Sequence, residues 1–211
     1  DNFEAYEGNT SIINNFCQAV SLVPPKKIIF LSSASVYGED VSHLKKITEQ
    51  TPVQPKSYYG ISKYASENLL KKTCEDNNIS MVILRPPLIY GKDDLSRGYG
   101  PTGFIYKALE DKEIILWGDG SEYREFIYIE DVSNIIDRIL QNDFTGILNL
   151  VSGSSYTFED IKLIIEKKLN KNIIIKSRKR SKEKVNHFYE NKLLKKNSYN
   201  YKFHSLEDGI N

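Results

Sequence analysis

Short apolar runs alternate along this chain with segments whose apolar residues recur at helical spacing. The run Lys-Ile-Ile-Phe-Leu at residues 27–31 is typical of a buried strand. Residues 11–20 place Ile12, Phe16 and Val20 on one side, which predicts a helix. The same patterns predict strands at residues 80–84, 114–117, 126–129, 147–151 and 173–175, and helices at 57–76, 102–110, 131–140 and 157–169. This alternation predicts an α/β protein with a largely parallel sheet.

Helix starts and loops follow from the residues between these segments. Ser57, Asp131 and Thr157 each precede a helical pattern and can accept a hydrogen bond from its first free amides. Residues 39–56 are polar and contain prolines, and residues 92–100 are charged and contain glycine, so both are predicted loops.

The composition of the chain indicates which kinds of binding partner and which cellular compartment to expect. The 211 residues are 40% hydrophobic with a net charge of +1, which favours neither nucleic acid nor an acidic membrane surface as a partner. Cys17, Cys74 and the histidines His43, His187 and His204 show no metal-ligand spacing. No apolar run approaches the roughly 18 residues of a membrane span. A reduced, cytoplasmic protein without a metal is the expectation.

Tyr59 and Lys63 form the first candidate for chemistry. On a helix, residues four positions apart project from one face. An ammonium beside a phenol favours the phenolate, so Lys63 is expected to lower the pKa of Tyr59 from about 10 and make it a proton acceptor or donor. A serine at the end of a nearby strand could hold the oxygen that exchanges the proton. The alternative interpretation is an ordinary tyrosine and a solvated lysine on a helix surface.

Further motifs occur in a fixed order around this pair. They are Ser-Ala-Ser-Val-Tyr-Gly at residues 33–38, Tyr59 with Lys63, Leu-Arg-Pro-Pro-Leu-Ile-Tyr-Gly at 84–91, Gly-Asp-Gly-Ser with Arg124 and its following apolar run at 118–131, and Ser-Leu-Glu-Asp-Gly-Ile at 205–210. Asn9 precedes the first predicted helix. With these motifs the chain resembles the extended short-chain dehydrogenase/reductase family, in particular its NAD-dependent nucleotide-sugar epimerase/dehydratase branch of UDP-glucose 4-epimerase-like enzymes.

The resemblance implies a fold and a division of the chain. Residues 1–91 would be the C-terminal portion of a Rossmann-type, doubly wound NAD-binding domain, to which residues 125–151 return. Residues 92–124 and 152–211 would form a smaller α/β substrate-binding subdomain. The family's glycine-rich turn for the cofactor pyrophosphate has no counterpart, because Gly8 is isolated. The resemblance therefore implies a fragment that lacks the N-terminal βα units and, alone, a competent NAD site.

The resemblance also implies a role for each matching residue. Tyr59 would exchange a proton with a sugar hydroxyl, Lys63 would lower the pKa of Tyr59 and bind the nicotinamide ribose, and Ser33 would hold the reacting oxygen. NAD would accept a hydride and return it to the other face of the keto-sugar. The implied NAD contacts are Asn9, Ser32, Tyr59, Lys63, Pro86 and Leu88; the implied substrate contacts are Ser33, Ser35, Tyr59, Arg124 and Arg178.

The expected substrate contacts are cationic because a nucleoside diphosphate carries clustered negative charge, which the two-pronged guanidinium binds. Arg124 is the first candidate by its motif. Arg178 is the second, and Arg180 follows closely in the basic run at residues 176–182. The same run also fits a solvated surface loop.

The residues at positions 34 and 35 argue against some of the reactions that this branch of the family catalyses. Dehydratases and decarboxylases of this branch carry an acidic residue two positions after the signature Ser or Thr, where this chain has Ser35, preceded by Ala34. Neither side chain can eliminate water as a general acid. The expectation is a UDP-sugar 4-epimerase that forms a homodimer through the helices near Ser11 and Tyr59. Leu88 stands where many epimerases place a substrate-binding Asn. A 4-keto-reductase and a non-catalytic sugar-nucleotide-binding fragment are the alternatives.

Overall fold

The computed structural model describes residues 1–41, 45–94, 99–180 and 183–210. Its helices are α1 (Phe3–Leu22), the 3-10 helix η1 (Ala34–Tyr37), α2 (Tyr58–Asp76), α3 (Pro101–Leu109), α4 (Ile129–Leu140), α5 (Phe158–Leu169), α6 (Lys192–Asn197) and α7 (Leu206–Gly209). Its strands are β1 (Lys27–Leu31), β2 (Ser80–Arg85), β3 (Leu88–Tyr90), β4 (Ile114–Trp117), β5 (Tyr123–Tyr128), β6 (Gly146–Asn149), β7 (Ser155–Thr157) and β8 (Ile175–Arg178). Parts of the predicted loops 39–56 and 92–100 and of the basic run lie outside the described residues.

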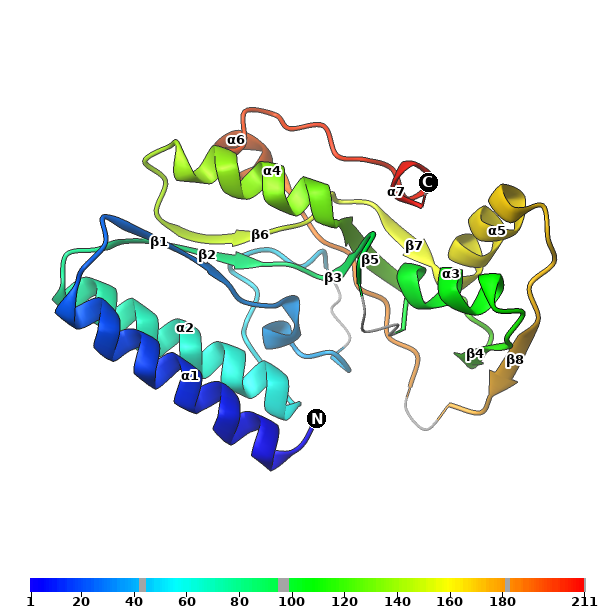
Figure 1. Ribbon diagram of the computed structural model, residues 1–211, viewed down its shortest axis with the longest axis horizontal. Coiled ribbons are helices and arrows are strands. Elements are labelled where there is room, and N and C mark those ends of the chain that lie inside the picture. Colours follow the sequence, from blue (N-terminus) through cyan, green and yellow to red (C-terminus); the bar gives the residue numbers. More distant parts are fainter. Residues whose placement is uncertain (42–44, 95–98, 181–182, 211) are drawn as a thin grey trace.

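The larger part of the molecule is a three-stranded parallel sheet in the order β1-β2-β6. Side chains alternate across its pleat, so Met81 and Ile83 of β2 pack towards α1 and α2. Val82 and Leu84 of the same strand pack on the opposite face with apolar residues of α4. Figure 1 shows the helical pair and α4 on opposite sides of the sheet. The prediction of an α/β protein with a parallel sheet is confirmed.

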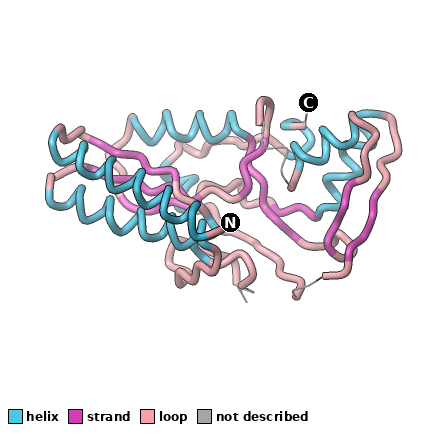
Figure 2. The backbone as a smooth tube through the Cα atoms, turned by 60° about the horizontal axis from the view of Figure 1, so that its bottom comes forward, coloured by secondary structure: helices cyan, strands magenta, loops and turns pink. Residues whose placement is uncertain are grey.

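The smaller part of the molecule contains α3, α5 and the parallel strand pair β4-β8. Phe104, Leu116, Phe158 and Ile161 are the centre of its apolar core. A second three-stranded sheet, in the order β3-β5-β7, connects this part with the larger one. The tube view in Figure 2 shows the two parts at opposite ends of the molecule. The division of the chain after residues 91, 124 and 151 stays a prediction.

Helices α1 and α2 lie side by side along one surface (Figure 1). They are the longest helices, with 20 and 19 residues. Both expose apolar side chains, namely Ile12, Phe16, Ile61, Tyr64 and Leu69. In the described part of the chain, no helix combines the length and the apolar character needed to cross a membrane.

Several element boundaries differ from the predictions; β5, for example, begins at Tyr123 and not at residue 126. The first helix begins at Phe3, because the side chain of Asn2 accepts the Ala5 amide, and Asn9 therefore lies inside this helix instead of preceding it. The last strand, expected at residues 173–175, is β8, Ile175–Arg178.

Asp131 is not the N-cap of α4, since the helix already begins at Ile129 and places Asp131 in its first turn. Its buried carboxylate accepts hydrogen bonds from the Tyr201 hydroxyl (2.8 Å) and the His204 amide (3.1 Å). A partner from the far end of the sequence thus replaces the local cap that the sequence predicted.

Candidate functional site

Local capping places Ser33 and Tyr59 at the ends of neighbouring elements. β1 ends at Leu31, and the Ser33 hydroxyl then caps η1 by accepting the Ser35 amide at 3.1 Å. Ser57 caps α2 by accepting the Gly60 amide at 3.0 Å, which starts the helix that carries Tyr59. Gly60 lies against this turn, since a Cβ on it would come within 3.0 Å of the Ser35 carbonyl oxygen.

One cavity of about 590 Å³ brings the predicted catalytic residues together. Ser33, Tyr59 and Lys63 all line it, at the carboxyl ends of β1 and β2. Ligands of open α/β sheets bind at this edge. The other lining residues are Leu31, Ser32, Ala34, Ser35, Glu39, Asp40, Pro86, Pro87, Leu88, Ile89, Arg124, Glu125, His187 and Tyr189.

The predicted direction of the Tyr59 pKa shift is wrong. Burial raises the pKa of Tyr59 above its ordinary value, the hydrogen bond with Ser33 opposes this rise, and the charge of Glu39 adds to it. Lys63 instead donates from Nζ to the Leu31 carbonyl oxygen at 3.0 Å, and its Nζ lies 5.7 Å from the centre of the Tyr59 ring. Burial lowers the pKa of Lys63, and Glu67 opposes that shift.

A buried ionic network supports this wall of the cavity. Arg85 of β2 donates from Nε and Nη2 to the two carboxylate oxygens of Glu67 at 2.9 and 2.6 Å. Glu67 lies one turn after Lys63 on α2 and also accepts the Ser32 hydroxyl at 2.5 Å. Arg85 donates further to the Tyr37 hydroxyl at 2.9 Å. The network therefore joins α2, β1, β2 and η1 next to the predicted catalytic residues.

The predicted cofactor and substrate residues divide into two groups. Those that line the cavity with the catalytic residues are Ser32, Ser35, Pro86, Leu88 and Arg124. Asn9 and Arg178 do not line it. The Asn9 amide donates to the Ser62 hydroxyl at 3.3 Å, and the Arg178 guanidinium lies 6.0 Å from the Trp117 ring centre. The Ser32 hydroxyl donates its one hydrogen to Glu67, so towards a ligand it can act only as an acceptor.

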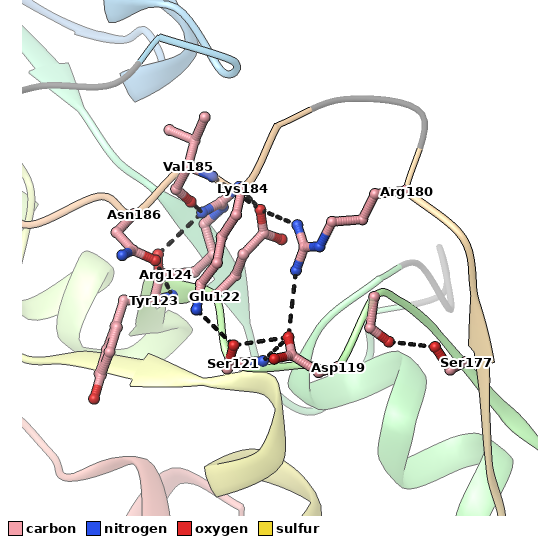
Figure 3. A network of polar contacts seen from close by, with 11 residues as sticks. Asp119, Ser121, Glu122, Tyr123, Arg124, Ser177, Arg180, Lys184, Val185 and Asn186 are labelled. Atoms are coloured by element: carbon pink, nitrogen blue, oxygen red, sulfur yellow. Dashed lines mark hydrogen bonds and ion pairs between the residues drawn. The ribbon is translucent and has the colours of Figure 1, made fainter.

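Arg180, which the sequence ranked behind Arg178, lies beside Arg124 (Figure 3). Both guanidinium groups contact Oε1 of Glu122, Arg180 from Nη1 at 2.6 Å and Arg124 from Nη2 at 3.4 Å. Arg124 also donates from Nη1 to the backbone carbonyls of Tyr123 and Val185. Two arginines from segments far apart in the sequence therefore meet at one carboxylate, and one of them lines the cavity.

Sequence reasoning missed a buried acid in the cavity wall. Glu125 is only 2% exposed, and its Oε1 accepts the Gly153 amide at 2.7 Å and the Ser152 hydroxyl at 3.0 Å. Burial raises the pKa of Glu125 to about 7, and these hydrogen bonds oppose the rise. Its place before Phe126 in the 118–131 motif was visible in the sequence, but its burial was not. Glu39 and Asp40 also line the cavity, so acidic groups are present beyond positions 34 and 35.

Comparison with known protein families gives a match over most of the chain. Residues 1–150 match the model of the NAD dependent epimerase/dehydratase family. A putative UDP-glucose 4-epimerase of Methanocaldococcus jannaschii is 30% identical over 168 residues, which are 76% of this chain and 53% of the relative. GDP-mannose 3,5-epimerase 1 of Oryza sativa subsp. indica is 28% identical over 165 residues, 74% of this chain and 44% of the relative. The chain thus spans about half the length of these curated relatives.

Two solved structures share the fold. One is the UDP-glucuronic acid 4-epimerase of Bacillus cereus in complex with NAD, with a TM-score of 0.85, 25% identity, and coverage of 96% of this chain and 64% of the other. The second is the UDP-N-acetylglucosamine 4-epimerase of Methanobrevibacter ruminantium, with a TM-score of 0.82, 25% identity, and coverage of 96% and 67%.

Proposed function

Because this chain belongs to the NAD-dependent epimerase/dehydratase family, we propose that it supplies the proton-transfer and nucleotide-sugar-binding residues of a UDP-sugar 4-epimerase. One observation carries the proposal. A single cavity is lined by Ser33, Tyr59 and Lys63, which come from two separate elements, together with Arg124 from a third. The identity to a putative UDP-glucose 4-epimerase supports the choice of reaction.

The residues present fit the nicotinamide end of NAD. Lys63 uses one donor on the Leu31 carbonyl, which leaves other ammonium hydrogens for a ribose, and Pro86 and Leu88 give the cavity an apolar wall. Tyr59, Lys63, Pro86 and Leu88 are the residues that would hold this end. Bound NAD supplies the capacity to accept and return a hydride.

Tyr59 and Ser33 are the residues that would transfer the proton and hold the sugar oxygen. The raised pKa keeps the Tyr59 phenol protonated near neutral pH, so it can donate a proton to the sugar oxygen in the half-reaction that reduces the keto-sugar. The half-reaction that oxidises the sugar hydroxyl needs the ionised phenolate, which accepts the proton of that hydroxyl. Its hydrogen bond with Ser33 favours the ionised form and so opposes the effect of burial. Ser33 is itself held by the Ser35 hydroxyl at 2.9 Å, which orients it towards the same oxygen.

Arg124 and Arg180 are the proposed diphosphate ligands, with Arg180 replacing the predicted Arg178. Changing Arg124 or Arg180 to Gln is expected to weaken UDP binding by about ten- to a hundredfold, because each loses a charge-assisted hydrogen bond. Calorimetric titration of the 211-residue chain with UDP measures this. The matched control is R178Q, which is expected to change binding less than about threefold because the Arg178 guanidinium lies over the Trp117 ring and not beside Arg124. A larger loss in R178Q than in R180Q contradicts the choice of Arg180.

A homodimer through α1 and α2 is the proposed assembly. The exposed residues Ile12 and Phe16 are one helical turn apart on α1, as Ile61 and Tyr64 are on α2, and an apolar face of this kind is suited to a second copy. The chain is expected to elute at twice its 24.3 kDa mass in light-scattering chromatography. The double change I12D and F16D is expected to give monomers, whereas L163D on the exposed surface of α5 leaves the mass unchanged. Dimeric I12D/F16D contradicts this interface.

A further inference from the structure

Glu122 is the centre of the polar cluster in Figure 3. This residue, just before β5, is 8% exposed, and its Oε1 accepts three donors: Arg180 Nη1 at 2.6 Å, the Val185 amide at 3.2 Å and Arg124 Nη2 at 3.4 Å. A single carboxylate oxygen is therefore shared by both arginines of the proposed diphosphate site and by the backbone of the segment that follows Arg180.

The remaining donors of the two arginines are used unequally. Nη1 of Arg124 donates to the Tyr123 and Val185 carbonyl oxygens. Nη2 of Arg180 is buried and makes no hydrogen bond with any residue that the structure describes, and its ion-pair partner, Oδ1 of the exposed Asp119, is 3.8 Å away. Nη2 of Arg180 is thus left without a hydrogen-bond acceptor among the described residues, while one nitrogen of each guanidinium group is directed at Glu122.

We propose that Glu122 is an internal counter-ion that determines the affinity of this site for a nucleoside diphosphate. The inference rests on the proposed function, in which Arg124 and Arg180 bind that diphosphate. In the ligand-free protein, Glu122 neutralises one of the two positive charges and holds both guanidinium groups together. An arriving diphosphate competes with the carboxylate for Arg180 Nη1 and Arg124 Nη2, and the two anions repel each other.

The effect of Glu122 depends on its negative charge and on the short distance of that charge from the two guanidinium groups. A glutamine at position 122 keeps an oxygen that can accept the Val185 amide, so Val185 stays bound next to β5. The same change removes a negative charge from a site of low exposure, where electrostatic interactions are screened less than in water. Neutralising the carboxylate therefore strengthens anion binding without removing a ligand of the phosphate.

The test is calorimetric titration of the 211-residue chain with UDP. E122Q is expected to bind UDP about tenfold more tightly than the wild type, as expected when one repulsive charge at close range is removed. The control is E113Q, which makes the same change in net charge at a half-exposed carboxylate paired with Lys176. E113Q is expected to bind within about twofold of the wild type, because exposed charges further away are screened.

Two outcomes separate this inference from the proposed function. Unchanged or weaker UDP binding by E122Q, with binding still weakened in R124Q and R180Q, overturns the role of Glu122 and leaves the diphosphate site intact. Unchanged binding in R124Q and R180Q overturns the site itself. Should circular dichroism show that E122Q is unfolded, E122D provides the measurement. It withdraws the carboxylate from Arg180 by one methylene, and it is expected to bind UDP more tightly than the wild type. Equal or weaker binding by E122D overturns the inference.

Discussion

Replacing Tyr59 by Phe is expected to lower turnover by about 100- to 10,000-fold in any form of this protein that interconverts sugar epimers, because a positioned general acid–base contributes an effect of this size. The ring of Phe keeps the packing of Tyr59 against the cavity wall and removes only the hydroxyl that bonds with Ser33. The measurement is the rate of conversion of UDP-glucose to UDP-galactose with NAD present. A Y59F enzyme that retains its turnover contradicts the proposed proton transfer.

Tyr58 provides a closely matched control for this experiment. It precedes Tyr59 on α2 and has the same exposed fraction, 42%, but it packs on Phe3 and Tyr6 of α1 and does not line the cavity. Y58F is therefore expected to keep its turnover. Because acidic groups also line the cavity, the products are examined for a 4-keto-6-deoxy sugar, whose formation would assign the protein to the dehydratases of its family.

The pKa of Tyr59 gives a second readout that does not require turnover. The phenol is expected to titrate above its ordinary value of 10, in ultraviolet difference spectra referenced to Y59F. Changing Ser33 to Ala removes the hydrogen bond that lowers this pKa, so the Tyr59 titration is expected to move further upward. A downward shift in S33A contradicts the hydrogen bond between these residues.

Changing Glu125 to Gln is expected to stabilise the protein at pH 8 by about 3 kcal/mol and to have little effect near pH 4. The buried carboxyl has a pKa of about 7 in the folded protein, against an ordinary value of 4.5. Between these values the folded chain binds more protons at this position than the unfolded chain. The contribution of Glu125 to the free energy of unfolding therefore falls as the pH rises from 4.5 through 7, and Gln does not show this fall.

Urea unfolding of both proteins at several pH values measures this difference. The Gln oxygen can accept the hydrogen bonds from Ser152 and Gly153, so the comparison isolates the charge. E113Q, at a half-exposed carboxylate paired with Lys176, is expected to change the free energy of unfolding by less than about 1 kcal/mol. A stability difference between E125Q and the wild type that does not grow from pH 4.5 to pH 7 contradicts the raised pKa.

The predicted helix starts agree with the structure where the N-cap side chain bonds only within its own helix. The caps at Ser57 and Thr157 start α2 and α5 as predicted, because both side chains accept a backbone amide within their own helix. The prediction failed at Asp131, whose carboxylate is bound by Tyr201 and His204 from the end of the chain. Periodicity contains no information about such distant partners.

For the candidate site, the order of the motifs was sufficient to select Ser33, Tyr59 and Lys63, which the structure places in one cavity. The sequence was not sufficient to choose between Arg178 and Arg180, because the two residues lie in the same basic run. Arg178 is the last residue of β8 and lies over the Trp117 ring, whereas Arg180 lies beyond the end of the strand and contacts Glu122. Only the tertiary contacts of Arg180 and Val185 with Glu122 and Arg124 distinguish them.

By itself, the sequence determined the α/β alternation and the four-residue spacing of Tyr59 and Lys63, since helix and strand periods are properties of neighbouring residues. The tertiary structure decided the charge state of the groups around that pair. Burial reversed the expected shift of the Tyr59 pKa, raised that of Glu125 and placed Glu122 between two arginines. Solvent exposure and charge partners depend on segments that are distant in sequence, and folding alone brings those segments together.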